Sequence, residues 1–400
     1  MHHDLIKQKV AQAAAILHET GIDCWITFAR ETVLNGDPIL DYLVPGNLTW
    51  HSALIISSTG GACAIVGKYD RQMVVDTGAY AQVLDYVQGI REPFLSYMHT
   101  LRPHSIAINY SVDSEICDGI THGMYLTLME MLAKAGLDGC VISAEPVISA
   151  LRQRKSPAEL AAMREAIRHT EEIYDMAGAA IRPGMTEAHI AAFMREEVAR
   201  RGLGFAWDPR SCPSVFTGPD TAGAHYAPTE RIVRGGHVLN MDFGVKVDGY
   251  VSDIQRSYYV LRQGESVAPG EVLKGFDTIA RAIESARLVM KPGVEGIVVD
   301  TAARRVITGE GYEEFPHALG HQVGRFAHDG TALLAPQWEK YGRKPFVLLE
   351  EGMVFTIEPR LTVPGHGVVT VEEMVVVTKD GAEYLSRTQK ELRYIQADNQ

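Results

Sequence analysis

The chain has 400 residues, of which 46% are hydrophobic and 22% are charged, and its formal net charge is −12. This composition predicts a globular protein of two domains and excludes a mostly disordered, collagen-like or membrane-embedded chain. The negative charge argues against a nucleic-acid or anionic-membrane partner, because both need a basic surface on the protein.

The five cysteines are odd in number, far apart in the sequence and never arranged as a C-x-x-C pair. We interpret them as reduced residues, which are typical of a cytosolic protein. The first 17 residues lack the apolar core of a signal peptide, and no apolar stretch approaches the roughly 18 residues that span a bilayer. We therefore expect a cytoplasmic protein.

Residues 1–151 alternate between helical and strand-like patterns. Apolar residues at helical spacing predict helices, and short apolar runs next to turn residues predict buried strands. The predicted elements are a helix at 6–17, strands at 24–28, 53–56 and 62–66, a helix at 126–135 and a strand at 140–142. The histidines of this half are scattered singly, so we expect an α/β domain without a catalytic cluster.

A capping box at 156–159, Ser-Pro-Ala-Glu, marks the start of the second domain. It opens a long helical stripe that ends at the Pro-Gly pair 183–184, after which Thr186 caps another helix. A similar stripe at 272–290 ends at the Pro-Gly pair 292–293, 109 residues after the first. We interpret this as a duplicated helix–Pro-Gly–helix unit, each copy followed by β-hairpins; the alternative is two unrelated helix pairs.

Two aspartates lie on a predicted hairpin over residues 240–253. The Asp-Gly pair at 248–249 is typical of a two-residue turn. Such a turn places Asp253 opposite Gly244, with Asp242 two residues further along the same face. Same-face diagonal neighbours are about 7–8 Å apart, so the two carboxylates converge.

A second predicted hairpin, over residues 354–374, carries two glutamates in the same way. A turn centred on Gly365 places Glu358 directly opposite Glu372, because both are seven residues from it. Glu373 then points to the other face, since side chains alternate along a strand.

Three histidines, His317, His321 and His328, lie within twelve residues between the hairpins. The first two are four residues apart, a spacing that suits a helical zinc site. Gly320 and Gly324 favour a kinked strand or loop instead. Only one of the two histidines therefore needs to be a metal ligand.

Four converging carboxylates and a histidine need compensation, because uncompensated they would repel and raise one another's pKa by several units. One divalent cation leaves a formal charge of −2 and two leave zero, so we predict a dinuclear site. Imidazole and carboxylate ligands suit Mn, Co, Fe or Zn. Two such ions hold a bridging water, lower its pKa and polarise a carbonyl, which is hydrolytic chemistry without a covalent nucleophile.

These residues, in this order, resemble the M24 metallopeptidase family, in its Xaa-Pro dipeptidase (prolidase) and aminopeptidase P branch. The similarity covers nearly the whole chain and implies an α+β fold. A creatinase-type α/β domain would occupy residues 1–151, and a pita-bread catalytic domain with pseudo-twofold internal duplication would occupy 152–400. The five family ligands match Asp242, Asp253, His321, Glu358 and Glu372.

The resemblance also implies a role for each ligand. Asp242 would bind one metal, His321 and Glu358 would bind the other, and Asp253 and Glu372 would bridge both. Glu358 would in addition be the general base that takes a proton from the bridging water and passes it to the leaving amine.

Three further histidines match family positions outside the ligand set. His225 would bind substrate near the scissile bond, and His317 and His328 would stabilise the tetrahedral intermediate. The family further implies a homodimer, in which the N-terminal domain of one subunit shapes the pocket of the other.

The chain departs from the family pattern at several positions near the ligands. The usual G-H-G-I-G run is Gly320-His-Gln-Val-Gly324 here. Gln255 replaces a threonine two residues after Asp253, and Thr370 replaces an arginine two residues before Glu372. Arg360 stands where the family prefers glycine. These changes leave the metal ligands intact and bear on substrate specificity.

Three hypotheses of function follow. The first is a dinuclear metal-dependent peptidase that hydrolyses the Xaa-Pro bond of dipeptides or short peptides through a metal-bridging hydroxide. The second is a non-peptidase enzyme of the same fold, either a creatinase-like or ectoine-hydrolase-like amidohydrolase or a dimethylsulfoniopropionate-lyase-like enzyme. The third, a non-catalytic binding protein, is disfavoured because such proteins lack the ligand set. The intact ligands favour the first.

Overall fold

The computed structural model describes residues 2–221 and 226–397. The chain divides into two units, Met1–Arg152 and Gln153–Gln400, each with its own hydrophobic core. In these described ranges no helix combines the length and the apolar content needed to cross a membrane. All five cysteines are free, and four of them are buried.

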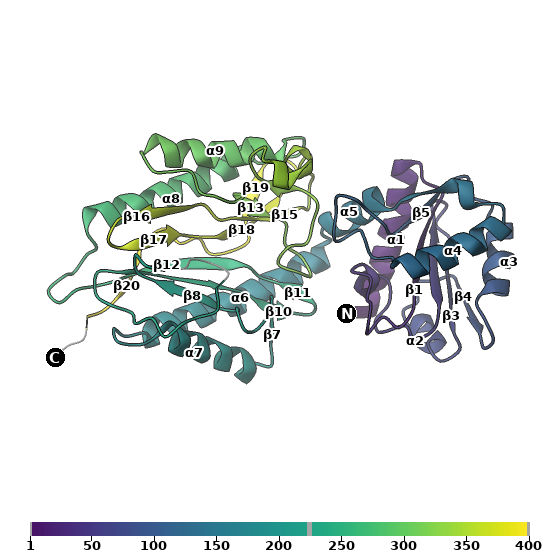
Figure 1. Ribbon diagram of the computed structural model, residues 1–400, viewed down its shortest axis with the longest axis horizontal. Helices are drawn as coiled ribbons and strands as arrows, with labels where there is room; N and C mark the ends of the chain where they lie inside the picture. Colours follow the sequence, from purple (N-terminus) through teal and green to yellow (C-terminus); the bar gives the residue numbers. More distant parts are fainter. Residues whose placement is uncertain (1, 222–225, 398–400) are drawn as a thin grey trace. The chain divides into compact units, whose positions relative to one another are not determined.

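The first unit is built on a six-stranded sheet in the order β4-β3-β2-β1-β5-β6 (Figure 1). Strand β2 pairs antiparallel with β1 and with β3, whereas β4 pairs in parallel with β3, β5 with β1 and β6 with β5. The strands are β1 (Cys24–Ala29), β2 (Ser52–Ser57), β3 (Ala62–Gly67), β4 (Gln82–Tyr86), β5 (Ile106–Ile108) and β6 (Val141–Ser143). The helices are α1 (His2–Thr20), α2 (Arg71–Val75), α3 (Arg91–Leu101), α4 (His122–Lys134) and α5 (Glu145–Gln153).

This sheet is covered on both faces, because its strands carry continuous apolar runs. Successive residues of β1 belong to opposite cores: Trp25 packs with residues of α1 and α5, and Ile26 packs with residues of α3 and α4. The predicted helices and strands of this half are confirmed. Their ends differ from the predicted ones by at most four residues, as is usual at fraying or irregular termini.

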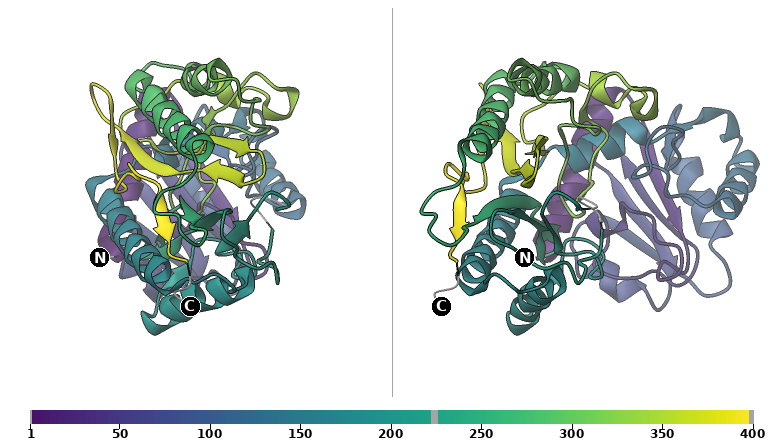
Figure 2. Two further views of the ribbon diagram at one scale, coloured as in Figure 1. Left: turned by 90° about the vertical axis from the view of Figure 1, so that its left-hand side faces the viewer. Right: turned by 60° about the vertical axis from the view of Figure 1, so that its left-hand side comes forward.

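In the second unit, two helix pairs lie on opposite sides of several small β-sheets (Figures 1 and 2). Helices α6 and α7 pack on strands of the first half of the unit, and α8 and α9 pack on strands of the second half. The helices are α6 (Pro157–Ala180), α7 (Glu187–Arg200), α8 (Gly270–Val289) and α9 (Gly296–Gly309).

The strands of the second unit form a four-stranded sheet in the order β20-β12-β9-β8, two three-stranded sheets and two two-stranded ladders. They are β7 (Gly204–Phe205), β8 (Ser214–Thr217), β9 (Val238–Phe243), β10 (Val245–Val247), β11 (Tyr250–Val251), β12 (Ile254–Val260), β13 (Gly320–His321), β14 (Leu333–Leu334), β15 (Val354–Ile357), β16 (Arg360–Val363), β17 (Gly367–Thr370), β18 (Glu373–Val377), β19 (Ala382–Tyr384) and β20 (Arg393–Ile395).

The backbone supports the predicted duplication. Both ends of α7 recur 109 residues later as the ends of α9. The glycines of the two Pro-Gly hinges, Gly184 and Gly293, have φ values of 88° and 84°. Glycine adopts this left-handed conformation without steric cost, so each hinge turns the chain from one helix into the next in the same way. These matched features favour a duplication over two unrelated helix pairs.

The helix caps lie where the sequence predicted them. Ser156 Oγ accepts a hydrogen bond from Glu159 N, and Glu159 Oε2 accepts one from Ser156 N, which completes the capping box. Thr186 Oγ1 accepts from His189 N at the start of α7. The buried Glu159 also accepts a hydrogen bond of 2.8 Å from Tyr250 Oη, so the start of α6 anchors the tip of the first hairpin.

Candidate metal centre

The first pair of carboxylates lies on the hairpin formed by β9 to β12. Its Asp-Gly turn has positive φ at both positions, 49° and 84°, which is the geometry of a type I′ turn. Lys246 pairs with Val251 beside the turn, and the same register continues to Gln255 opposite Asp242. The predicted register is confirmed, and it makes Asp242 and Asp253 diagonal neighbours on one face.

Two contacts hold the strands of this hairpin beside the aspartates. Tyr174 Oη, from α6, lies 2.8 Å from Met241 O and 2.6 Å from Ile254 O, and each of these residues adjoins a candidate ligand. Gly244 permits the close approach of the strands, since a Cβ there would lie 1.9 Å from Ser252 O. The backbone that carries the two aspartates is therefore tightly fixed.

The second hairpin places the glutamates as predicted. In both of its ladders, β16 with β17 and β15 with β18, the paired residues are equally distant from Gly365. Glu358 and Glu372 share this register and so lie opposite each other. Glu373 makes an ion pair with Arg256, with Nη2 3.1 Å from Oε2.

His321 lies in a two-residue strand, β13, and the glycines around it exclude a helix as expected. Gly320 is required there, because a Cβ would lie 2.0 Å from Thr356 O of the neighbouring strand β15. His321 Nε2 lies 3.8 Å from Asp253 Oδ2 and 3.4 Å from Glu358 Oε1. The imidazole thus joins carboxylates from both hairpins.

The other three predicted histidines have different positions. The ring of His328 is nearly perpendicular to that of His321, with centroids 4.2 Å apart, and it lines the same cavity. His317 is half-buried, with Nδ1 2.7 Å from Ala318 O, and is not among the described residues that line the cavity. His225 lies outside the described residues.

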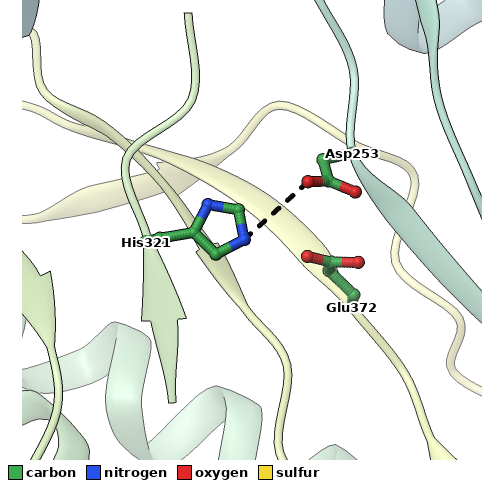
Figure 3. A group of neighbouring side chains, drawn as sticks. All are labelled: Asp253, His321 and Glu372. Atoms are coloured by element: carbon green, nitrogen blue, oxygen red, sulfur yellow. Dashed lines mark ion pairs between the residues drawn. The ribbon is translucent and has the colours of Figure 1, made fainter. Parts of the chain in front are cut away.

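All five predicted metal ligands line one cavity with a volume of about 210 Å³. Asp253, His321 and Glu372 offer ligand atoms that all lie within 4.8 Å of one another. Figure 3 shows these three side chains converging from separate segments of the chain. The other described residues that line the cavity are Trp207, Ser211, Ser214, Gln255, Ala327 and His328.

The electrostatics of the cavity favour a bound cation. Burial raises the pKa of all four carboxylates, and neighbouring carboxylates raise the pKa of Asp253, Glu358 and Glu372 further. Asp242 Oδ1 and Glu372 Oε2 are buried and have no hydrogen-bond partner among the described residues. Since buried polar atoms are nearly always satisfied, divalent cations fit this donor set by compensating the charge and binding the unpaired oxygens.

Gln255 also lines the cavity, although the sequence marks it only as a departure from the family pattern. Its Nε2 lies 3.2 Å from Glu358 Oε2. Gln255 is two residues after Asp253 and so lies on the same face of the strand. The alternation of side chains therefore could have predicted it as a cavity residue. Trp207, by contrast, comes from a loop before β8 and belongs to no motif that points to the site.

Similarity to known proteins identifies the family of this chain. Residues 161–379, more than half of the chain, match the model of metallopeptidase family M24. The chain belongs to this family. This M24 chain is 30% identical over 251 residues to an Xaa-Pro dipeptidase of Lactobacillus helveticus, with 62% of this chain and 64% of the relative covered.

Two further matches extend over more of the M24 chain. It is 27% identical over 346 residues to "Probable dipeptidase PepE" of Mycobacterium tuberculosis (strain ATCC 25618 / H37Rv), with 85% of this chain and 84% of the relative covered. The solved structure of an Xaa-Pro dipeptidase from Bacillus anthracis superposes with a TM-score of 0.75 at 22% identity, covering 98% of this chain and 100% of that chain.

These findings confirm the predicted family and its Xaa-Pro dipeptidase and aminopeptidase P branch. They also confirm the α+β pita-bread fold, which the solved relatives share. The M24 chain is therefore a metallopeptidase by family.

Proposed function

We propose that the chain is a dinuclear metal-dependent peptidase that hydrolyses the Xaa-Pro bond of dipeptides or short peptides. The observation that carries this proposal is the convergence of four buried carboxylates and His321 on one cavity, with two carboxylate oxygens unpaired. The name of the Lactobacillus relative supports the substrate class.

Two divalent ions, of Mn, Co, Zn or Fe, balance the four negative charges and suit imidazole and carboxylate ligands. Asp242 would hold one ion and His321 with Glu358 the other, while Asp253 and Glu372 would contact both. When bound, such ions lower the pKa of a water molecule and polarise a substrate carbonyl.

The side chains around the ions supply proton transfer and binding. Glu358 accepts a proton from the attacking water and passes it to the leaving amine, as a general base that lines the cavity. His328 lines the cavity and can donate to the oxygen that becomes negative in the transition state. The family resemblance supports similar roles for His225 and His317. Trp207 offers an apolar wall to the substrate.

We also propose an assembly and a location for the chain. The family resemblance supports a homodimer. Five free cysteines support a reducing compartment and hence a cytoplasmic protein.

The test is a peptidase assay of the purified chain with added Mn²⁺ or Co²⁺. We expect release of proline from Xaa-Pro dipeptides, no release after chelation, and recovery when metal is restored. Matched Xaa-Ala dipeptides serve as the control for specificity. Failure on every Xaa-Pro peptide, with metal shown to be bound, would reject the proposal in favour of a small-amide hydrolase or a lyase of the same fold.

A further inference from the structure

Gln255 lies at the contact between the two hairpins that carry the candidate ligands. It belongs to β12 and is 4% exposed. Its Nε2 lies 3.2 Å from Glu358 Oε2, and its Oε1 lies 3.3 Å from Thr370 Oγ1. Its backbone oxygen accepts a hydrogen bond of 3.2 Å from Glu372 N. One residue of the first hairpin thus contacts the segments of both glutamate ligands.

These contacts fix the orientation of the amide. As a metal ligand Glu358 is an ionised carboxylate, which can only accept hydrogen bonds, so Gln255 presents its NH₂ group to it. The carbonyl oxygen of the amide then faces Thr370 Oγ1, which lies 3.3 Å from it and 3.2 Å from a second acceptor, Pro359 O. Because reversal would place the amide oxygen against a carboxylate, the contact with Glu358 selects this orientation.

The contact also distinguishes the two oxygens of Glu358. Gln255 holds Oε2, whereas Oε1 lies 3.4 Å from His321 Nε2. Rotation of the carboxylate would break the amide hydrogen bond, so Oε1 stays directed at the ligand cluster. Hydrogen bonds of this kind orient metal ligands, and their loss typically costs about 10–100-fold in metal affinity or activity.

We propose that Gln255 is a positioning residue that orients Glu358 for cation binding and is itself held by Thr370. The inference rests on the proposed function, because it takes Glu358 as a ligand of the metal centre. Beyond the proposed function, the amide of Gln255 and the hydroxyl of Thr370 form a neutral pair that links the two hairpins and fixes Glu358.

Mn²⁺ binding to the purified full chain, measured by competition with a fluorescent chelator and without substrate, tests the proposal. Gln255→Met keeps the approximate length of the side chain and removes the donor. We expect it to weaken Mn²⁺ binding about 10–100-fold. Thr362→Val, at an exposed position on β16 of the second hairpin, is the control and should bind as the wild type does.

Thr370 provides a second test that survives if Gln255→Met does not fold. Thr370→Val preserves the shape of the side chain and removes the hydroxyl, and we expect a smaller loss of affinity than in Gln255→Met. Thr370→Ser keeps the hydroxyl and should restore wild-type binding. Since both residues act through one chain of contacts, the double variant of Gln255→Met and Thr370→Val should lose no more than Gln255→Met alone, whereas independent effects would add.

Three results would overturn the proposal: wild-type Mn²⁺ affinity in Gln255→Met, equal affinities in Thr370→Val and Thr370→Ser, or additive losses in the double variant. A purely structural role would lower the melting temperature of the metal-free variants and leave their Mn²⁺ affinities equal. Because the assay needs no substrate, a chain that binds Mn²⁺ as expected but cleaves no Xaa-Pro peptide would count against the proposed function alone.

Discussion

Glu372 and Glu373 are adjacent in the sequence and each is 1% exposed, yet their surroundings are opposite. Glu373 receives hydrogen bonds from Arg256 at 3.1 Å, from Ser386 Oγ at 2.5 Å and from Gln389 N at 2.7 Å. Glu372 Oε2 has no hydrogen-bond partner within the described ranges. Both oxygens of Glu373 therefore have hydrogen-bond donors from the protein, whereas one oxygen of Glu372 has no partner among the described residues.

The difference shows how a buried acid can be recognised as structural or as a ligand. Burial raises the pKa of both groups, but Arg256 opposes the rise at Glu373, whereas Asp253 and Glu358 add to it at Glu372. A buried charge without a partner is costly. The chain supplies its own cation, Arg256, at Glu373, and the absence of such a partner at Glu372 among the described residues supports the proposal that Glu372 binds a cation from solution.

The largest expected effect is on turnover, and it comes from changing a carboxylate that lines the cavity together with Glu372. Glu358→Gln removes the proton acceptor, so kcat for an Xaa-Pro dipeptide should fall by about 10³-fold, within the range of general-base catalysis. Glu383→Gln, at an exposed position on β19, is the control and should keep wild-type turnover. Near-normal turnover in Glu358→Gln would reject the assignment of the general base.

The different surroundings of Glu372 and Glu373 can be tested by the free energy of unfolding of a variant at each position. Glu373→Gln leaves Arg256 buried without its carboxylate, and we expect the free energy of unfolding to fall by about 3–5 kcal/mol. Glu372→Gln removes one of several repelling charges, so it should not destabilise the metal-free chain and should weaken Mn²⁺ binding. Urea unfolding in the presence of a chelator measures both. Equal destabilisation by the two substitutions would show that the comparison is wrong.

A smaller effect is expected in the pH dependence of the metal-free chain. The ligand carboxylates have raised pKa values in the folded state, so the folded chain holds more protons than the unfolded chain above about pH 4. The free energy of unfolding should therefore fall as the pH rises from 5 to 8.

Saturating Mn²⁺ should remove this fall, because the cations compensate the ionised carboxylates. Asp253→Asn should reduce it in the metal-free chain. A free energy of unfolding of the metal-free wild type that rises over the same pH range would contradict the assigned direction of the pKa shifts.

Much of the site could be predicted because its geometry is local. Each hairpin keeps one register from its turn to its ligands, so counting from the turn residues placed Asp242 with Asp253 and Glu358 with Glu372. The glycines beside His321 correctly favoured a strand or loop over a helix. The roles of the individual ligands and the position of His225 stay predictions.

The contacts between the hairpins could not be predicted in this way. Gln255 and Thr370, which the sequence shows only as two separate departures from the family pattern, touch each other although they are 115 residues apart. Counting fixes the register within a hairpin and says nothing of how two hairpins approach. For the same reason the partner of Glu373, Arg256, had no signal in the sequence.

The central claim is that the paired acids of the two hairpins stay buried because divalent cations lie among them. Measurement of metal content in purified, active protein by plasma mass spectrometry tests this most directly. The account predicts two divalent ions per chain, removed by chelation together with the activity and restored with it. Full activity in protein that holds no metal would contradict it.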